Sequence, residues 1–205
     1  MALNNNQLVA PWGNLANRML SFCYKNWDGH IPDIKPTDLR EADLNLLATI
    51  EKGFETVGNE LNTIHLRAAL SEAMKLSTEV NRYIDANAPW TSIKTDRQAA
   101  ALTVYTALKA IDSLKILFAP ILPFSSEKLH SFFGYQTPLF GEQYVENVED
   151  SLGEHTVLRY KPAAGGSVLW QPSNLQPGQQ LNQPAPLFKK LDESVVEEER
   201  ARLGK

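Results

Sequence analysis

Cysteine and long apolar runs are nearly absent from this sequence of 205 residues. Cys23 is the only cysteine, which excludes an internal disulfide and a metal site built from several cysteines. The four histidines are scattered, so we expect no metal site. No apolar stretch approaches the roughly 20 residues that a membrane-spanning helix needs, and the N-terminus lacks a basic start and an apolar signal core. We therefore expect a cytoplasmic protein without a membrane partner.

The sequence also lacks an excess of positive charge. Its formal net charge is −4 at pH 7. Proteins that hold nucleic acids by backbone electrostatics alone usually carry a strong basic excess. If the chain binds a nucleic acid, it must therefore do so through a few specifically positioned side chains, and most of the affinity must come from outside this chain.

Motifs that carry catalysis are missing as well. The sequence has no glycine-rich phosphate loop, no nucleophile elbow and no pair of histidines at metal-ligand spacing. Acidic pairs such as Glu41 with Asp43, and the acidic run 197–199, are explained better as solvated helix faces. The chain alone is therefore predicted not to be a catalyst and to hold no cofactor.

What the sequence does contain is helical periodicity through its first 135 residues. Apolar side chains recur there at steps of three and four, the spacing of amphipathic helices with one buried face. Turn formers and prolines separate the runs. The pattern predicts helices near residues 14–22, 37–61, 66–84, 95–118 and 125–134. Several such helices with short connections indicate an all-α fold, an antiparallel helical bundle over residues 1–135.

The composition changes at about Tyr135. The following residues are rich in Gly, Pro, Gln and Asn and show little helical periodicity, whereas the last twenty again have helical composition, with acidic residues early and basic ones late. We expect residues 136–205 to form an irregular C-terminal extension with at most short strands, followed by a final helix. Long irregular segments in compact domains tend to be functional or to pack on another body.

Three side chains form a candidate binding site. Asn14 and Arg18 are four residues apart, so on a helix they lie on one face, one turn from each other. Trp90 follows Pro89, where the third helix must end. A base can stack on an indole while an amide and a guanidinium read its edge, which is how proteins usually recognise unpaired RNA bases.

Simpler interpretations of the same residues remain open from spacing alone. Asn14 could cap the first helix, Arg18 could form a surface salt bridge, and Trp90 could plug the end of the bundle. Periodicity also does not choose among the four tryptophans, because Trp12, Trp27 and Trp170 are rival aromatic side chains. Trp12 in particular could be exposed or part of the core.

Five segments then point to a family. They are NNQLVAPWGNLANR, WDG, NRYIDANAPW, LKILFAPILPFSSEKLHSFFG and LQPGQQLNQPAPLFKKLD, and they occur in the family's order along nearly the whole chain. In these segments the chain resembles the C-terminal anticodon-binding domain of bacterial methionyl-tRNA synthetases, a helical bundle of the class I synthetase type. Asn87 departs from the acidic or glutamine-type residue expected in this turn, which leaves the secondary contacts open.

The resemblance implies a function and a site. The family's domain recognises the methionine anticodon CAU, chiefly through its cytosine, and its asparagine, arginine and tryptophan match Asn14, Arg18 and Trp90. Trp90 is then the platform on which the cytosine stacks. The partner implied is methionine tRNA.

The resemblance also implies a missing part. The family's catalytic domain, with its HIGH and KMSKS elements, makes methionyl-adenylate from ATP and methionine, and neither element occurs in this chain. The chain is therefore expected to be a fragment of an ATP-dependent ligase, inactive alone, whose C-terminal extension packs back toward that catalytic domain.

Two rival functions stay open. One is the anticodon-binding domain of another class I synthetase, such as those for cysteine, leucine or valine, which would not be expected to carry this Asn, Arg and Trp set. The other is a helical protein-interaction module without enzymatic context, in which Trp12 or Trp170 would matter and Asn14 would not.

Overall fold

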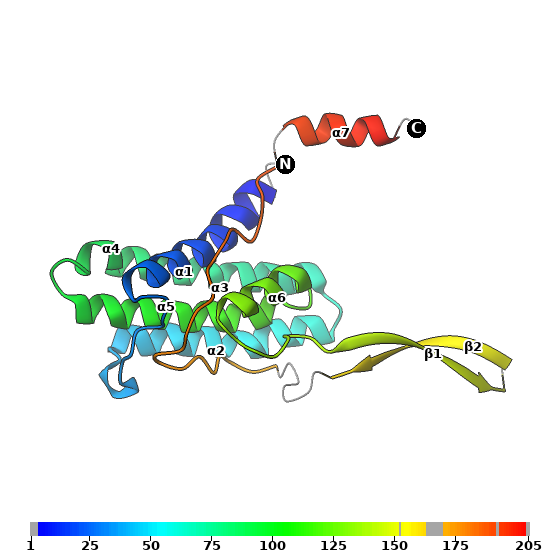
Figure 1. The fold of residues 1–205 in the computed structure, drawn as a ribbon, viewed down its shortest axis with the longest axis horizontal. Helices are drawn as coiled ribbons and strands as arrows, with labels where there is room; N and C mark the ends of the chain where they lie inside the picture. The colour runs from blue at the N-terminus through cyan, green and yellow to red at the C-terminus, as the bar shows by residue number, and fades with distance from the viewer. Residues whose placement is uncertain (1–3, 152, 163–169, 192, 204–205) are drawn as a thin grey trace.

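The computed structural model describes residues 4–151, 153–162, 170–191 and 193–203. It confirms the all-α expectation for the body of the protein and adds one strand pair (Figure 1). The helical elements are η1 (Asn4–Gly13), α1 (Asn14–Asn26), η2 (Pro36–Asp38), α2 (Glu41–Asn62), α3 (Leu66–Asn87), α4 (Pro89–Ser92), α5 (Arg97–Phe118), α6 (Pro123–Phe132) and α7 (Glu193–Leu203). The strands are β1 (Glu142–Asp150) and β2 (Gly153–Lys161).

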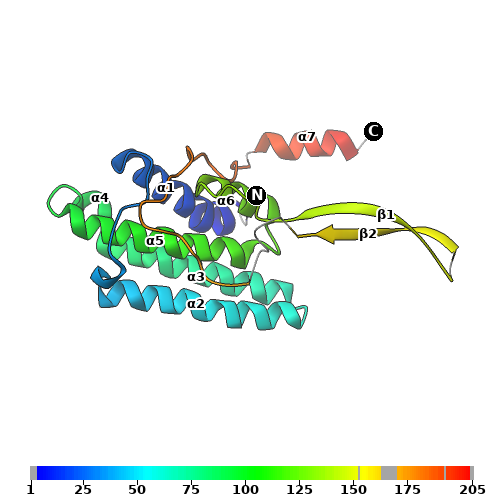
Figure 2. The same ribbon diagram turned by 60° about the horizontal axis from the view of Figure 1, so that its bottom comes forward.

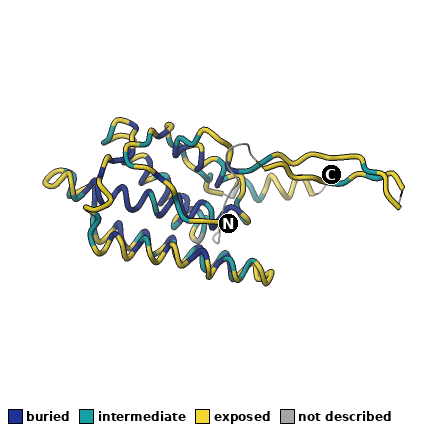
Figure 3. The backbone as a smooth tube through the Cα atoms, turned by 90° about the horizontal axis from the view of Figure 1, so that it is seen from below, coloured by how far each residue is buried: buried dark blue, intermediate teal, exposed yellow. Residues whose placement is uncertain are grey.

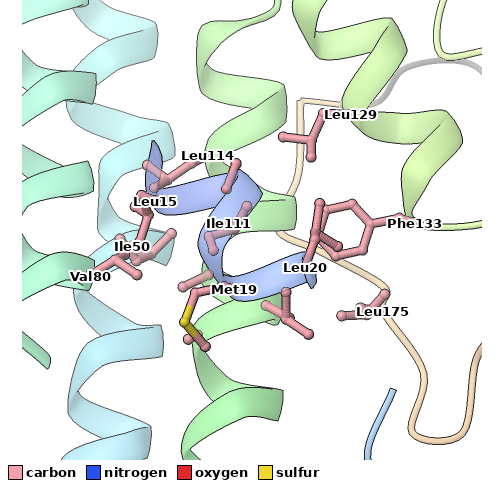
Figure 4. Packing of buried hydrophobic residues seen from close by; sticks show 14 of the residues in the cluster. Leu15, Met19, Leu20, Ile50, Val80, Ile111, Leu114, Leu129, Phe133 and Leu175 are labelled. Atoms are coloured by element: carbon pink, nitrogen blue, oxygen red, sulfur yellow. The ribbon is translucent and has the colours of Figure 1, made fainter. Parts of the chain in front are cut away.

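Three helices of 22 residues each, α2, α3 and α5, form the centre of the bundle. The helices α1 and α6 pack against α5 (Figure 2). Nearly every side chain of α5 is buried, because neighbours surround this helix on all sides. Figure 4 shows α1 contributing Leu15, Met19 and Leu20 to the same core as Ile111 and Leu114 of α5. Burial of these apolar side chains is the main force that holds α1 across the bundle.

The segment before α1 is helical too, in a π-type conformation that includes Pro11. It places Trp12 in the core, where the side chain is 1% exposed and its ring centroid lies 4.6 Å from that of Phe118. Trp12 is therefore a core residue, which settles one of the alternatives left open by the sequence.

The strands β1 and β2 form an antiparallel hairpin that projects from the bundle and is mostly exposed (Figure 3). Each strand has nine residues, longer than the short strands that we expected. Val145 lies opposite Leu158, and Arg159 Nε donates to Glu146 Oε2 at 2.7 Å across the pair. Because solvent reaches both faces, the strands lack the alternation of buried and exposed positions that marks a strand in a sequence.

Residues 170–191 return along the bundle and have partners within the chain. Leu175 and Leu181 are buried in the core cluster. The amide of Ile31 donates to Gln179 O at 2.8 Å, and the Gln179 amide group donates to Phe133 O at 2.6 Å. The division of the chain at residue 135 stays a prediction, but part of the C-terminal extension completes the core of the bundle.

Candidate RNA-binding site

Trp90 stands on a tight turn at one end of the bundle. The helix α3 ends at Asn87, and Ala88 adopts a left-handed conformation with φ 37°. Pro89 then begins α4, as expected of a residue that fits the first turn of a helix but cannot continue one. Trp90 is next, and the residue is 36% exposed. The turn therefore holds a large aromatic ring at the surface.

Arg18 of α1 lies against this ring. Its guanidinium carbon is 5.0 Å from the centroid of the Trp90 ring, within the range of a cation–π contact. The sequence predicted that Arg18 and Trp90 act together, and the structure brings them into contact although they are 72 positions apart along the chain. The contact is at the surface, because the Arg18 side chain is 44% exposed.

Two side chains of α3 hold Arg18 from the other side. Arg18 Nη2 donates to Asn81 Oδ1 at 3.4 Å and is 3.8 Å from Asp85 Oδ1. Asn81 is itself fixed, because its Nδ2 donates to Pro11 O at 2.8 Å and to Ser77 O at 2.9 Å. The sequence analysis did not identify Asn81 and Asp85. Their four-residue spacing shows that they share a helical face, but only the structure shows that α1 crosses it.

Asn14 is the first residue of α1, one helical turn from Arg18, and is exposed. The N-cap position belongs to Gly13, so Asn14 does not cap the helix as one alternative proposed. Within the described ranges its side-chain amide makes no hydrogen bond. Asn14 thus presents a free donor and a free acceptor beside the Arg18 and Trp90 pair.

The other tryptophans have different surroundings. Trp170 Nε1 donates to Phe54 O at 2.8 Å, and the two rings meet edge to face at 5.4 Å. Trp27, directly after α1, lies under the guanidinium of Arg97, which is 5.2 Å from its ring centroid. The indole of Trp90, in contrast, contacts Arg18 of the predicted pair Asn14 and Arg18.

A buried polar cluster connects α2, α3 and α5 beneath this end of the bundle. Asp43 is fully buried, and it accepts hydrogen bonds from Arg40 Nη2 at 2.7 Å and from the Tyr83 hydroxyl at 2.5 Å. Arg40 also donates to Thr103 Oγ1 at 2.9 Å. Burial raises the pKa of the Asp43 carboxyl, but the hydrogen bonds from Arg40 and Tyr83 outweigh burial and leave the pKa below its usual value. Burial and the Asp43 charge raise the pKa of Tyr83.

Trp90 and Arg18 are exposed at the surface of the bundle. A groove of about 680 Å³ lies beside the first half of α3, lined by Leu8, Pro11, Leu70, Met74 and neighbouring polar residues. Trp90 is not among the residues that line this groove. Stacking of a base needs an accessible ring face and hydrogen-bonding groups at its edge, which an open surface supplies.

The described residues contain no group of three or more His, Cys, Asp or Glu side chains that could hold a metal ion. Among these residues, no helix is both long and apolar enough to cross a membrane. The expected absence of a metal site and of a cofactor site stays a prediction.

Known proteins match this chain closely. The family model described as the anticodon binding domain of methionyl tRNA ligase matches residues 32–157, a span that includes Trp90 but not Asn14 or Arg18. A methionine–tRNA ligase of Thermomicrobium roseum is 50% identical over 201 residues, which is 98% of this chain and 34% of the relative. One of Chloroflexus aurantiacus is 48% identical over 203 residues, which is 98% of this chain and 33% of the relative. The chain thus spans about a third of the length of these curated relatives.

Solved structures share the fold. The apo form of Mycobacterium tuberculosis methionyl-tRNA synthetase superimposes with a TM-score of 0.71 at 23% identity, covering 93% of this chain and 34% of that one. The same synthetase bound by methionyl-adenylate gives a TM-score of 0.68 at 24% identity, covering 91% of this chain and 32% of that one. The family match covers more than half of the residues and confirms the family that the sequence resemblance indicated. The chain belongs to the family of methionyl-tRNA ligase anticodon-binding domains.

Proposed function

We propose that this chain reads the CAU anticodon of methionine tRNA, with Trp90 stacking on the cytosine and with Asn14 and Arg18 hydrogen-bonding the edge of that base. The observation that carries the proposal is the contact of the Arg18 guanidinium with the exposed indole of Trp90. Asn14 stands one turn away, and its amide makes no hydrogen bond to the described residues. A stacking platform and two edge-reading groups are therefore gathered at one end of the bundle.

The chemistry of these side chains suits cytosine. A cytosine edge carries acceptors and an amino donor, and it pairs with a guanidinium that donates and with an amide that accepts. Uracil has an acceptor at its fourth ring position and a donor at its third, the reverse of cytosine. Asn14 and Arg18 would therefore leave hydrogen-bonding groups of uracil unsatisfied. Stacking on the indole contributes on the order of 1–3 kcal/mol, and two-point hydrogen bonding discriminates by a similar amount.

In this structure Arg18 covers part of the ring on which the base is to stack. Its other contacts are long, 3.4 Å to Asn81 and 3.8 Å to Asp85, and both the Arg18 and Asp85 side chains are largely exposed. Exposed ion pairs of this kind contribute about 0–1 kcal/mol. An arriving base therefore displaces the guanidinium from the ring face to its own edge at little cost.

We also propose that the chain acts within an ATP-dependent methionine–tRNA ligase in the cytoplasm. Its relatives carry that name and are about three times as long. In this proposal ATP and methionine bind to a catalytic domain outside this chain. The exposed hairpin and α7, which belong to residues 136–205, face that catalytic domain.

The first test is the affinity of the chain for a short RNA hairpin with a CAU loop. We expect Trp90→Ala to weaken binding by about 1–3 kcal/mol while leaving thermal unfolding nearly unchanged, because the ring is partly exposed. Trp170→Phe is the matched control, since that ring packs on Phe54 instead. A large loss of thermal stability in Trp90→Ala, with unchanged RNA affinity for the folded fraction, would support the bundle-plug interpretation and contradict ours.

The second test concerns discrimination. Arg18→Ala removes a donor from the edge of the base, so we expect it to lower the preference for CAU over a loop with the cytosine replaced more than it lowers overall affinity. Binding curves for both hairpins with the wild-type and variant chains measure this preference. Equal losses for both hairpins would show that Arg18 contacts only the backbone.

A further inference from the structure

A second arginine–tryptophan pair lies at the same end of the bundle. The guanidinium carbon of Arg97 is 5.2 Å from the centroid of the Trp27 ring. Arg97 Nη2 also donates to Asn26 O, the last carbonyl of α1, at 2.6 Å. Two contacts of different kinds therefore fix the guanidinium in place, although Arg97 is exposed.

The helix α1 connects the two pairs. Arg18 lies within α1 and Asn26 ends it, so at about 1.5 Å per residue the pairs are roughly 12 Å apart along the helix. On the other side of the site, α4 carries Trp90 and the next helix, α5, begins with Arg97. Figures 1 and 2 both show α4, the start of α5 and the end of α1 together at one end of the bundle. Phe22 fills the interval on α1 and meets the Trp27 ring edge to face, with 6.1 Å between centroids.

Arg97 also differs from most other arginines of the chain in its partners. Arg18, Arg40, Arg82, Arg159 and Arg202 each have a carboxylate within 4.0 Å. Arg97 has none among the residues that the structure describes. The adjacent Asp96 is engaged as the N-cap of α5, where its side chain accepts from the amide of Ala99 at 2.9 Å. The positive charge of Arg97 thus has two defined contacts and no carboxylate partner among the described residues.

We propose that Arg97, held over the ring of Trp27, binds a phosphate of the RNA backbone close to the base that stacks on Trp90. A planar guanidinium offers N–H donors in a fork that matches two phosphate oxygens, and only one donor is used by Asn26. Trp27 acts as a positioning residue, because it fixes the plane of the fork without contacting RNA itself. The inference rests on the proposed function and adds a contact that fixes the register of the RNA without reading its sequence.

The test compares the salt dependence of hairpin binding for Arg97→Ala and wild-type chains. Losing one phosphate contact should weaken binding roughly tenfold, equally for CAU and cytosine-replaced loops, and should reduce the slope of log affinity against log salt by about 0.7–0.9. Arg97→Gln can keep a hydrogen bond to Asn26 but lacks the charge, so it should show the same lower slope. Thermal unfolding of each variant checks that the fold is kept.

Arg67 provides a matched control. It is exposed, has no carboxylate partner among the described residues, and lies at the start of α3, roughly 30 Å from the end that carries Trp90. Arg67→Ala should leave both affinity and slope unchanged.

Each other outcome identifies what is wrong. If Arg97→Ala binds as tightly as wild type with an unchanged slope while Trp90→Ala weakens binding to the CAU loop, the phosphate contact is refuted and the anticodon function stands. If Arg97→Ala weakens only the CAU loop, Arg97 contacts a base and the phosphate assignment is wrong. An equal effect of Arg67→Ala would show a diffuse charge effect, which also refutes the assignment. If the wild-type chain binds neither hairpin, the anticodon function fails together with this inference.

Discussion

At the end of the bundle, the ring of Trp90 is positioned by the backbone, whereas the side chain of Arg18 is only weakly held. Trp90 is placed by a left-handed Ala88 and by Pro89, so the position of its ring is set by the backbone. Arg18, in contrast, is held by contacts of 3.4 Å and 3.8 Å that a ligand replaces at little cost. Under the function that we propose, the ring of Trp90 would therefore be in place before RNA binds, and the guanidinium of Arg18 would move onto the edge of the base.

The fully buried carboxyl of Asp43 gives a prediction about stability and pH. Burial opposes its ionisation, but hydrogen bonds from Arg40 and Tyr83 leave its pKa below the usual value. A carboxyl with a folded-state pKa below its unfolded value of about 3.9 stabilises the protein above that pH, and this stabilisation is lost as the pH falls through the folded-state pKa. We expect Asp43→Asn to lower the free energy of unfolding at pH 7 by roughly 2–3 kcal/mol, and the deficit to shrink at acidic pH.

Urea denaturation of the wild-type and Asp43→Asn chains at several pH values measures this deficit. Glu41→Gln is the control, because Glu41 lies in the same first turn of α2 but is exposed. It should change stability by less than about 0.5 kcal/mol. A deficit for Asp43→Asn that stays constant down to low pH would show that the charge of Asp43 is not what stabilises the fold.

Two neighbouring segments of the C-terminal extension differ in how they relate to the bundle. The hairpin of β1 and β2 has mostly exposed residues on both faces and lies away from the core. The segment after it places Leu175, which is 1% exposed, into the core, and Ser173 Oγ donates to the buried carboxylate of Asp112 at 2.5 Å. The hairpin therefore adds little to the stability of the bundle, whereas the returning segment is part of its core.

Replacing residues 143–160 by a short Gly-Ser connection tests this difference. We expect the free energy of unfolding to change by less than about 1 kcal/mol, because few buried contacts are lost. Leu175→Ala should cost about 2–5 kcal/mol, since it leaves a cavity in the core. Chemical denaturation of both variants measures these changes. A larger loss of unfolding free energy from the hairpin replacement than from Leu175→Ala would show that the hairpin is a structural part of the bundle.

For the whole molecule, the net charge of −4 limits how RNA can be bound. Many surface charges of either sign are paired with one another, as in Lys75 with Glu72 and Arg82 with Glu79. Arg97, which has no carboxylate partner among the described residues, lies beside the candidate site. We infer that the chain contacts only a few nucleotides, and that most of the affinity for the tRNA comes from other parts of the ligase.

Much of this architecture could be predicted from the sequence, for identifiable reasons. Strong apolar periodicity predicted the long helices, and the motif order predicted the family. Helical spacing put Asn14 beside Arg18, but it could not show that α1 crosses α3 at Asn81 and Asp85, because helix packing is a property of the assembled core. Short strands at most were expected, and the nine-residue length was not predicted, since exposure on both faces removes the alternation from which strands are recognised. Burial of Trp12 was also beyond the sequence, because it depends on contact with the distant Phe118.

The most direct test of the account follows the four indole N–H signals of the chain by NMR as a CAU hairpin is added. Trp12 is buried, and Trp170 Nε1 donates a hydrogen bond to Phe54 O, so the signals of these two indoles serve as internal references. We expect the Trp90 signal, assigned by mutation, to shift strongly with the CAU loop and much less when the cytosine is replaced, while Trp27 responds to both loops. A Trp90 signal that stays still while that of Trp12 or Trp170 moves would contradict the assignment of Trp90 as the stacking platform for the anticodon.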